Sequence, residues 1–310
     1  MTQLRQFYLQ YGLGYHCALF GKSRQSWYEQ QGRDEERHMA DALVLRLVGE
    51  IRQELPRAGV PKLHHMLSER LAGHGIKLGR DALYGLLGRH GLLLRYRRRR
   101  PQTTDSSHRY RRWPNLIREL GLLAHPGQLW VSDITYLRLA GGGFCYLTDA
   151  YSHKIVGHRL HPTLHSDGPA EALLMATGTS KMGASLIHHS DRGVQYCCTE
   201  YVRMLEHHGI RISMTENGDP YENAIAERVN GILKGEFLLD ATFATLAEAA
   251  AAVDSAVRRY NHVRPHASCD NLTPVVAHDQ TGVLRKRWKP KRRATSGVPD
   301  PASLHLMKSG

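Results

Sequence analysis

Three carboxylates in the middle of the chain have the residue types and surroundings of a catalytic set. Asp133 lies inside the β-branched, apolar run LWVSDITYLRL, where a lone carboxylate facing a core is costly unless it is paired or bound to a cation. Asp191 ends a second such run, SLIHHSD, and 35 residues separate it from Glu227. Taken singly, each acid also fits an exposed position or a turn. Each acid could also help to hold a hard cation, which takes oxygen ligands.

The stretch DPYENAIAERVNGILKGE, residues 219–236, predicts a helix with Glu227 on a narrow polar stripe. Its first four residues have the order of an N-cap aspartate, a first-turn proline and a capping-box glutamate. Lys234 lies roughly 10 Å further along the same face, where its ammonium could hold a nucleic-acid phosphate beside a cation. An exposed polar stripe without a ligand is the alternative. At about 100° per residue, the side chains within about 60° of Glu227 are Asn223, Asn230 and Lys234, whereas Glu236 falls on the opposite side.

Strand-like and helix-like runs alternate around these acids. The first three strands follow one another as a meander, and the later ones alternate with helices. This order predicts an α/β layered fold, in which ligands bind where strands end, and Asp133 and Asp191 lie at such positions. Strands are predicted at 129–139, 144–151, 154–161, 185–191 and 211–215, and helices around 170–176 and at 199–209 and 219–236.

The N-terminal third has helical rather than strand periodicity. Apolar residues recur with helical spacing over 39–54 and 60–71, and a glycine-bearing break separates these from a short amphipathic helix at 80–95. A smaller helix pair is predicted over 15–31. Helix, glycine-bearing turn and basic second helix favour a helix-turn-helix DNA-binding region, with the second helix as the groove reader. An ordinary helical hairpin would have the same pattern.

Charge is distributed unevenly along the 310 residues, which carry a net charge of +13. Residues 1–124 hold 22 basic against 11 acidic residues, 125–282 hold 12 against 17, and 283–310 hold 8 against 1. Basic segments are attracted to polyanions, and the acidic middle suits cation binding or catalysis. A solvated linker is the alternative for the densest basic run, which follows the second helix. Its predicted phosphate contacts are Arg95, Arg97, Arg98, Arg99, Arg100, Arg111 and Arg112.

Several other classes of protein are disfavoured. No window approaches 18 uninterrupted apolar residues, and the N-terminus lacks the basic-then-apolar run of a signal peptide, so we expect no membrane association. The five cysteines contain no C-x-x-C pair and are expected to be buried thiols. His188 and His189 lack an accompanying H-E-x-x-H or nucleophile elbow, so we interpret them as strand residues and not as a zinc or general-base site. Asp149 is interpreted as structural.

Four motifs together resemble one known family: LWVSDITYL, HHSDRGVQY, SMTENGDPYENAIAERVNGILKGEF and YNHVRPHASCDNLTP. They resemble the second-frame catalytic subunit of two-reading-frame bacterial insertion-sequence transposases, which has a DDE core of the retroviral-integrase type. The resemblance implies an RNase H-like mixed five-stranded sheet flanked by helices, preceded by an all-α helix-turn-helix-type region. The implied organisation is a helical DNA-binding region at 1–94, an Arg-rich linker at 95–124, the catalytic core with its closing helix at 125–282 and a basic tail at 283–310.

The resemblance also implies roles for the acids. Asp133, Asp191 and Glu227 match the DDE triad, whose carboxylates hold two Mg²⁺ ions that Mn²⁺ can replace. Asp133 would bridge both ions, and the other two acids would each complete one site. Lys234 matches the basic residue seven positions after the glutamate. Tyr260, Asn261, Arg264, Pro265 and His266 match the closing motif, and the further expected DNA contacts are Arg264, His266, Asn223 and Asn230.

The implied activity is that of a DDE transposase, with Mg²⁺-dependent cleavage at the ends of an insertion sequence followed by strand transfer into new DNA. Its partners would be double-stranded DNA at the element ends and the target, further copies of the chain, and a first-frame protein with a helix-turn-helix and a coiled coil. A bacterial cytoplasmic, nucleoid-associated location follows from this activity. Two alternatives stay open: a nuclease on the same scaffold that hydrolyses without joining, and a non-catalytic DNA-binding regulator derived from a transposase.

Overall fold

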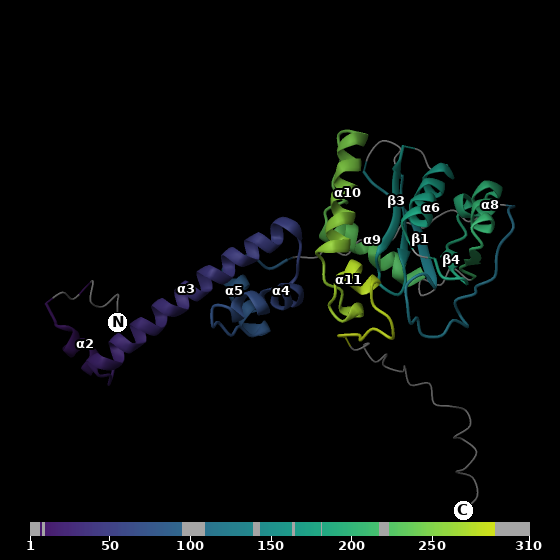
Figure 1. Cartoon of the computed structure of the whole chain (residues 1–310). Coiled ribbons are helices and arrows are strands. Elements are labelled where there is room, and N and C mark those ends of the chain that lie inside the picture. Colours follow the sequence, from purple (N-terminus) through teal and green to yellow (C-terminus); the bar gives the residue numbers. More distant parts are fainter. Residues whose placement is uncertain are drawn as a thin grey trace, which may run out of the picture.

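The computed structural model describes residues 7, 10–94, 109–138, 143–162, 165–180, 182–216 and 223–288 of the chain. These residues form an α/β core and an N-terminal arm of helices that projects from one side of it (Figure 1). In the described part of the chain, no helix is both long and apolar enough to cross a membrane. Some residues named in the sequence analysis lie outside the described part of the chain. They include Arg95, Arg97, Arg98, Arg99, Arg100, Asp219 and Glu222.

The core is built on a five-stranded mixed sheet with the strand order β3-β2-β1-β4-β5. β1 pairs antiparallel with β2, and β2 with β3, whereas β4 is parallel to β1 and β5 is parallel to β4. The first three strands form the predicted meander, and the predicted mixed five-stranded sheet is confirmed. The strands are β1 (Leu129–Tyr136), β2 (Gly143–Asp149), β3 (Ile155–His161), β4 (Ile187–Ser190) and β5 (Arg211–Met214).

Helices cover both faces of this sheet (Figure 1). Alternation along β2 separates the two layers, because successive side chains of a strand point to opposite faces. Cys145 and Leu147 pack with α6 and α8, while Phe144 and Tyr146 pack with α9 and α10. The helices of the core are α6 (Asp167–Thr179), α7 (Val194–Cys197), α8 (Thr199–His207), α9 (Ala224–Glu236), α10 (Leu246–His262) and α11 (Pro274–His278), with a 3₁₀ turn η2 (Ala267–Cys269).

The arm consists of α2 (Leu13–Leu19), α3 (Arg24–Glu54), α4 (Val60–Ala72) and α5 (Arg80–Arg89). α3 begins after its N-cap Ser23, whose hydroxyl accepts a hydrogen bond from the backbone N–H of Ser26. α3 then continues without a break. The second helix of the pair predicted over 15–31 and the helix predicted over 39–54 are therefore one element. α4, its glycine-bearing turn and α5 confirm the predicted helix, turn and second helix, although α5 ends before residue 95.

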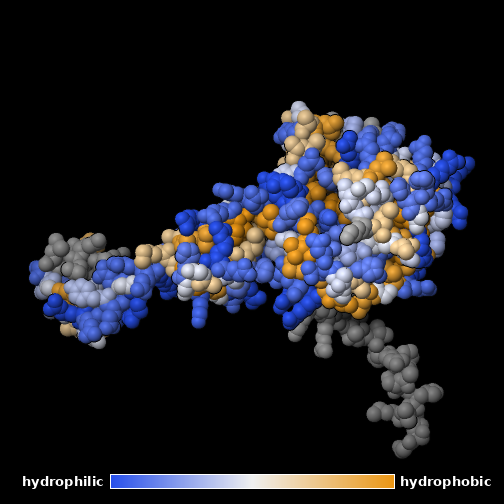
Figure 2. All heavy atoms as spheres, viewed as in Figure 1, coloured by the Kyte–Doolittle hydropathy of each residue, from blue (hydrophilic) through white to orange (hydrophobic). Residues whose placement is uncertain are grey.

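Arm and core share one hydrophobic cluster, which contains buried residues of α3, α4 and α5 together with others of α9 and α10. In the surface view, most residues are hydrophilic and hydrophobic ones gather where the arm meets the core (Figure 2). Polar contacts cross the same junction. The Arg57 guanidinium donates to the carbonyl oxygen of Gly235 at 3.4 Å, and Arg259 forms an ion pair with Glu54. The end of α9 is therefore held between the sheet and the arm.

The described end of the predicted linker packs on the core. Trp113 contacts the hydrophobic cluster under α6 and α8, and Leu116 and Ile117 contact the cluster around Leu129. The backbone N–H of Leu116 donates to the Ser213 hydroxyl on β5 at 2.9 Å. This part of the chain therefore packs on the core, and the predicted boundary at residue 125 stays a prediction.

Candidate active site

Asp133 on β1 and Asp191 directly after β4 occupy equivalent positions on neighbouring parallel strands. Val131 pairs with His189, and each acid lies two residues beyond its member of that pair. Positions two apart on a strand point to the same face, and paired strands lie about 4.8 Å apart. The fold therefore places these two acids side by side on one face of the sheet.

The start of α9 is fastened to this face close to Asp133. The Tyr146 hydroxyl on β2 lies 2.8 Å from the carbonyl oxygen of Ala226, in the first turn of α9, and 3.3 Å from Oδ2 of Asp133. Tyr146 is directly opposite Asp133 in the β1–β2 register, so the two side chains share a face. The side-chain amide of Asn223, the N-cap of α9, donates to the carbonyl oxygen of Ser132 at 3.4 Å.

Glu227 follows directly after Ala226, which is fully buried against Leu129 and Val131. Its own side chain is exposed beside this packed residue. The negative charge of Glu227 acts on Asp133, as does the charge of Asp191. The structure thus places Asp133 and Asp191 side by side, and Glu227 near enough for its charge to act on Asp133.

Asp133 titrates far from its ordinary range. Burial is the largest cause, and with the negative charges of Asp191 and, to a smaller extent, Glu227 it raises the pKa of Asp133 from 3.8 to about 7. Hydrogen bonds from the backbone N–H of Ile134 and from Tyr146 act in the opposite direction. Partial desolvation of the carboxylate, on a side chain that is otherwise exposed, also raises the pKa of Glu227. Crowded acids with raised pKa values are typical of functional sites.

The turn after β4 fixes Asp191 locally. The backbone N–H of Gly193 donates to Oδ1 of Asp191 at 3.0 Å. A Cβ atom at position 193 would lie 3.0 Å from that oxygen and 3.1 Å from Oε1 of Gln195, which is tighter than an ordinary contact. The glycine of the SDRG motif therefore lets the backbone approach the carboxylate closely enough to donate this hydrogen bond.

The donor set fits a hard divalent cation. Carboxylate oxygens are the ligands that Mg²⁺ takes, and a cation would relieve the repulsion that contributes to the raised pKa of Asp133. Among the described residues, no three His, Cys, Asp or Glu side chains already lie close enough to surround one metal ion. Cation binding would therefore require the carboxylates of Asp133, Asp191 and Glu227 to turn towards one another.

The predicted polar stripe continues along α9 from Glu227. Asn223, Asn230 and Lys234 are all partly buried. The Oδ1 atoms of Asn223 and Asn230 have no hydrogen-bond partner in the part of the chain that the structure describes. Within the described residues α9 begins at Ala224 with Asn223 as its N-cap, and the predicted helix start at residue 219 lies outside them. DNA contact by these three residues stays a prediction.

Two other predicted DNA contacts, Arg264 and His266, lie in the interior. Arg264 is 2% exposed, and its guanidinium donates two hydrogen bonds to the Glu236 carboxylate at 2.8 and 2.9 Å. His266 is 5% exposed and stacks on His153, with 5.2 Å between the ring centroids. Since neither side chain reaches the surface, the structure does not support their predicted DNA contacts and gives both residues a structural role.

Arg111 and Arg112 lie in the described end of the Arg-rich run, and both are exposed. The Arg111 guanidinium carbon lies over the ring of Trp113, 4.2 Å from its centroid. This stacking holds the Arg111 side chain beside the core. The predicted role of both arginines as phosphate contacts stays a prediction.

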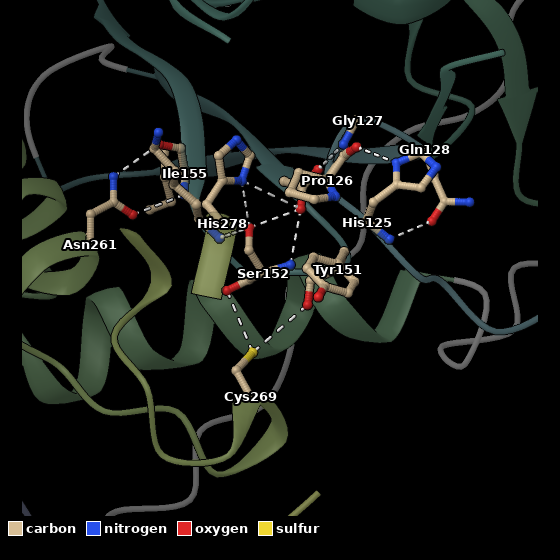
Figure 3. A network of polar contacts seen from close by, with 12 residues as sticks. His125, Pro126, Gly127, Gln128, Tyr151, Ser152, Ile155, Asn261, Cys269 and His278 are labelled. Carbon is tan, nitrogen blue, oxygen red and sulfur yellow. Dashed lines mark hydrogen bonds and ion pairs between the residues drawn. The ribbon is translucent and has the colours of Figure 1, made fainter. Parts of the chain in front are cut away.

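A buried polar network ties the closing segment of the core, which comprises α10, η2 and α11, to the sheet (Figure 3). The Ser152 hydroxyl donates to Oδ1 of Asp149 at 2.8 Å and lies 2.9 Å from Nδ1 of His278. Ser152 and Asp149 are both fully buried, so this serine, histidine and aspartate cannot meet a substrate. Asn261 accepts from the backbone N–H of Ile155 and donates to its carbonyl oxygen, both at 2.9 Å. The interpretation of Asp149 as structural is confirmed.

His188 and His189 are fully buried in β4. Nε2 of His188 lies 3.0 Å from the Tyr201 hydroxyl, and Nδ1 of His189 lies 2.8 Å from the Ser213 hydroxyl. Burial, with a smaller contribution from His189, lowers the pKa of His188 to about 3. Both histidines are strand residues held by internal hydrogen bonds, as predicted.

Two stretches of the chain match known domain families. Both families are described as an integrase core domain, and they match residues 124–220 and 208–274. The two matches together contain Asp133, Asp191 and Glu227.

Curated proteins and solved structures are similar to the chain over greater lengths. It is 32% identical over 269 residues to the insertion element IS600 uncharacterized 31 kDa protein of Shigella sonnei, covering 85% of this chain and 97% of that protein. It is 29% identical over 269 residues to transposase InsF for insertion sequence IS3A of Escherichia coli (strain K12), covering 83% and 91%. A simian T-cell lymphotropic virus intasome is 20% identical with a TM-score of 0.46, covering 77% of this chain and 81% of that one.

Proposed function

Because the chain belongs to the bacterial insertion-sequence transposases with an integrase core, we propose that Asp133, Asp191 and Glu227 are the carboxylates with which it cleaves and joins DNA. The observation that carries this proposal is the register of β1 and β4, which aligns the two aspartates, with the start of α9 fastened beside them. Acids gathered from three elements repel one another, and this repulsion contributes to the raised pKa of Asp133. Cation binding is the best reason for such an arrangement.

We propose two Mg²⁺ ions as the cofactor, with Mn²⁺ as a substitute. The carboxylates of Asp133, Asp191 and Glu227 would hold the two ions. When bound, the two ions activate an oxygen nucleophile and stabilise charge on the attacked phosphate and on the leaving oxygen. Hard cations with open coordination positions suit this role, since they bind phosphate oxygens directly.

The residues of the chain position the DNA and the acids. The β1–β4 register sets the spacing of Asp133 and Asp191, and α9 presents Glu227 to them. Lys234, two turns further along α9, would hold a phosphate of the bound strand.

The proposed reaction has two steps at phosphorus. Hydrolysis of a phosphodiester at the element end frees a 3′-hydroxyl. In strand transfer this hydroxyl oxygen forms a new P–O bond to a target phosphate, while one P–O bond of the target strand breaks and its oxygen leaves. One phosphodiester replaces another in the second step, so the exchange needs no nucleotide cofactor.

We also propose that the chain works as a homo-oligomer on double-stranded DNA, because two element ends and a target have to be held together. A first-frame protein with a helix-turn-helix and a coiled coil would help to recognise the ends. The mass of the chain on end DNA, measured by light scattering with and without that protein, tests the oligomeric state. Two or more chains per complex are expected, whereas a single chain on DNA under all conditions would contradict the proposal.

A joining assay tests the proposed activity. The full chain is incubated with Mg²⁺, a labelled duplex taken from the DNA that flanks its gene, and a plasmid target. We expect labelled products longer than the duplex, and their loss when EDTA removes the metal. Shortened duplex without any joined product would favour the nuclease alternative. DNA binding without any product, in Mg²⁺ or in Mn²⁺, would favour the regulator.

A further inference from the structure

Tyr146 on β2 is a fully buried residue whose hydroxyl reaches two parts of the candidate active site. The hydroxyl oxygen lies 2.8 Å from the carbonyl oxygen of Ala226 and 3.3 Å from Oδ2 of Asp133. The first of these groups belongs to the helix that carries Glu227, and the second is one of the three acids. One side chain therefore spans the gap between β1 and α9.

The ring of Tyr146 has little freedom to follow either group. It faces Phe144, with 5.4 Å between the ring centroids, and it packs in the hydrophobic cluster under α9 and α10. A phenol also has one proton to donate, so its two neighbours compete for the same donor. A shift of α9 relative to β1 would therefore lengthen one of the two contacts.

The helix backbone does not depend on this hydroxyl. The carbonyl oxygen of Ala226 lies in the first turn of α9, where helical geometry brings it the backbone N–H of the residue four positions on, Asn230. Removal of the hydroxyl would consequently leave no carbonyl of the helix without a donor. What the hydroxyl adds is a fixed spacing between the helix and the Asp133 carboxylate.

We propose that Tyr146 is a positioning residue of the cation site, because its hydroxyl fixes the Asp133 carboxylate relative to the start of α9 and so to Glu227. This inference rests on the proposed function of these two acids as cation ligands. Mg²⁺ demands near-ideal octahedral geometry, so carboxylates held at the wrong spacing bind it more weakly. Loss of the hydroxyl should thus lower cation affinity without preventing folding.

Tyr146→Phe tests the proposal, because it removes the hydroxyl and keeps the buried ring. Tyr196→Phe is the matched control, since Tyr196 is also buried and its hydroxyl lies 2.9 Å from the Ser132 hydroxyl, on the opposite face of β1. Calorimetric titration of the metal-free full chain with Mn²⁺ measures cation affinity, and thermal unfolding measures stability. Both variants should lose similar stability. Only Tyr146→Phe should raise the Kd for Mn²⁺. The expected increase is about tenfold, which corresponds to the loss of one hydrogen bond to a charged group.

Equal Mn²⁺ affinities for Tyr146→Phe and Tyr196→Phe would overturn the proposal. In the joining assay, Tyr146→Phe should need more Mg²⁺ for half-maximal rate and approach the wild-type rate when Mg²⁺ is in excess. The two proposals fail separately. If the wild type binds Mn²⁺ more tightly than Tyr146→Phe but joins no DNA, the positioning role stands and the proposed function is wrong. If joining proceeds and Tyr146→Phe needs no additional metal, the positioning role is wrong and the proposed function stands.

Discussion

Lys62 of the helical arm lies 3.1 Å from the carboxylate of Glu236, the last residue of the helix whose first turn carries Glu227. Arg264 contacts the same carboxylate, so two cations share one largely buried acid. Burial alone would raise the pKa of Glu236, but hydrogen bonds and positive charge from Arg264 and Lys62 outweigh it and lower that pKa. Burial and the charge of Arg264 lower the pKa of Lys62, against the attraction of Glu236. α9 is thus fixed to the arm at one end and to the sheet at the other.

Arg264→Met should destabilise the chain far more than Lys62→Met. The Arg264 side chain is 3% exposed, and its loss would leave the Glu236 carboxylate buried without its bidentate partner, which typically costs about 3–5 kcal/mol. Lys62→Met keeps the Arg264–Glu236 pair and should cost about 1 kcal/mol. Urea unfolding of the full chain measures both losses. If the Arg264→Met chain keeps its stability but binds DNA less tightly, the structural role is wrong and the DNA contact first predicted for Arg264 is supported.

Without metal, Asp133→Asn should stabilise the chain at pH 8 but hardly at pH 4. The pKa of Asp133 in the folded chain is about 7, above its ordinary 3.8, so the folded chain keeps a proton that the unfolded chain releases between about pH 4 and pH 7. Wild-type stability therefore falls as the pH rises through this window, and asparagine removes that dependence. Thermal unfolding in EDTA should show an advantage of the variant that grows with pH by up to about 4 kcal/mol, since each pKa unit corresponds to about 1.4 kcal/mol. Parallel pH profiles for the two proteins would contradict the raised pKa.

Lys234→Ala should weaken DNA binding and make it less sensitive to salt. A lysine that neutralises one phosphate contributes about one unit to the slope of log affinity against log salt concentration. Lys234→Arg keeps the charge and serves as the control. Fluorescence anisotropy with a labelled duplex over a range of salt concentrations measures both quantities. An unchanged slope for Lys234→Ala would argue against a close phosphate contact.

The sheet and the aspartates on it could be predicted from local patterns. β-branched and aromatic runs identify β1 to β3, and alternation with helices predicts that the later strands run parallel. Both aspartates were expected where strands end; Asp191 does follow β4, whereas Asp133 lies inside β1, and the register of β1 and β4 places the two side by side. Helical phase also placed Glu236 opposite Glu227, where it contacts the arm.

Contacts between distant segments could not be predicted in the same way. The helix start predicted from the DPYE pattern lies outside the described residues, and the amide of Asn223, the N-cap of α9, contacts β1 instead of capping the helix. Arg264 matches a family motif, yet its partner Glu236 lies 28 residues away and meets it only because α9 packs beside the closing segment. Tyr146 has no local feature that sets it apart, because its role depends on pairing opposite Asp133.

The joining reaction of carboxylate variants tests the central claim most directly. Asp133→Asn, Asp191→Asn and Glu227→Gln should each reduce Mg²⁺-dependent joining of labelled DNA ends to the background without protein, while DNA binding stays largely intact. Glu206→Gln, at an exposed acid on α8, is the matched control and should join DNA as the wild type does. If the Glu227→Gln chain joins DNA ends at the wild-type rate, the three carboxylates do not form the active site.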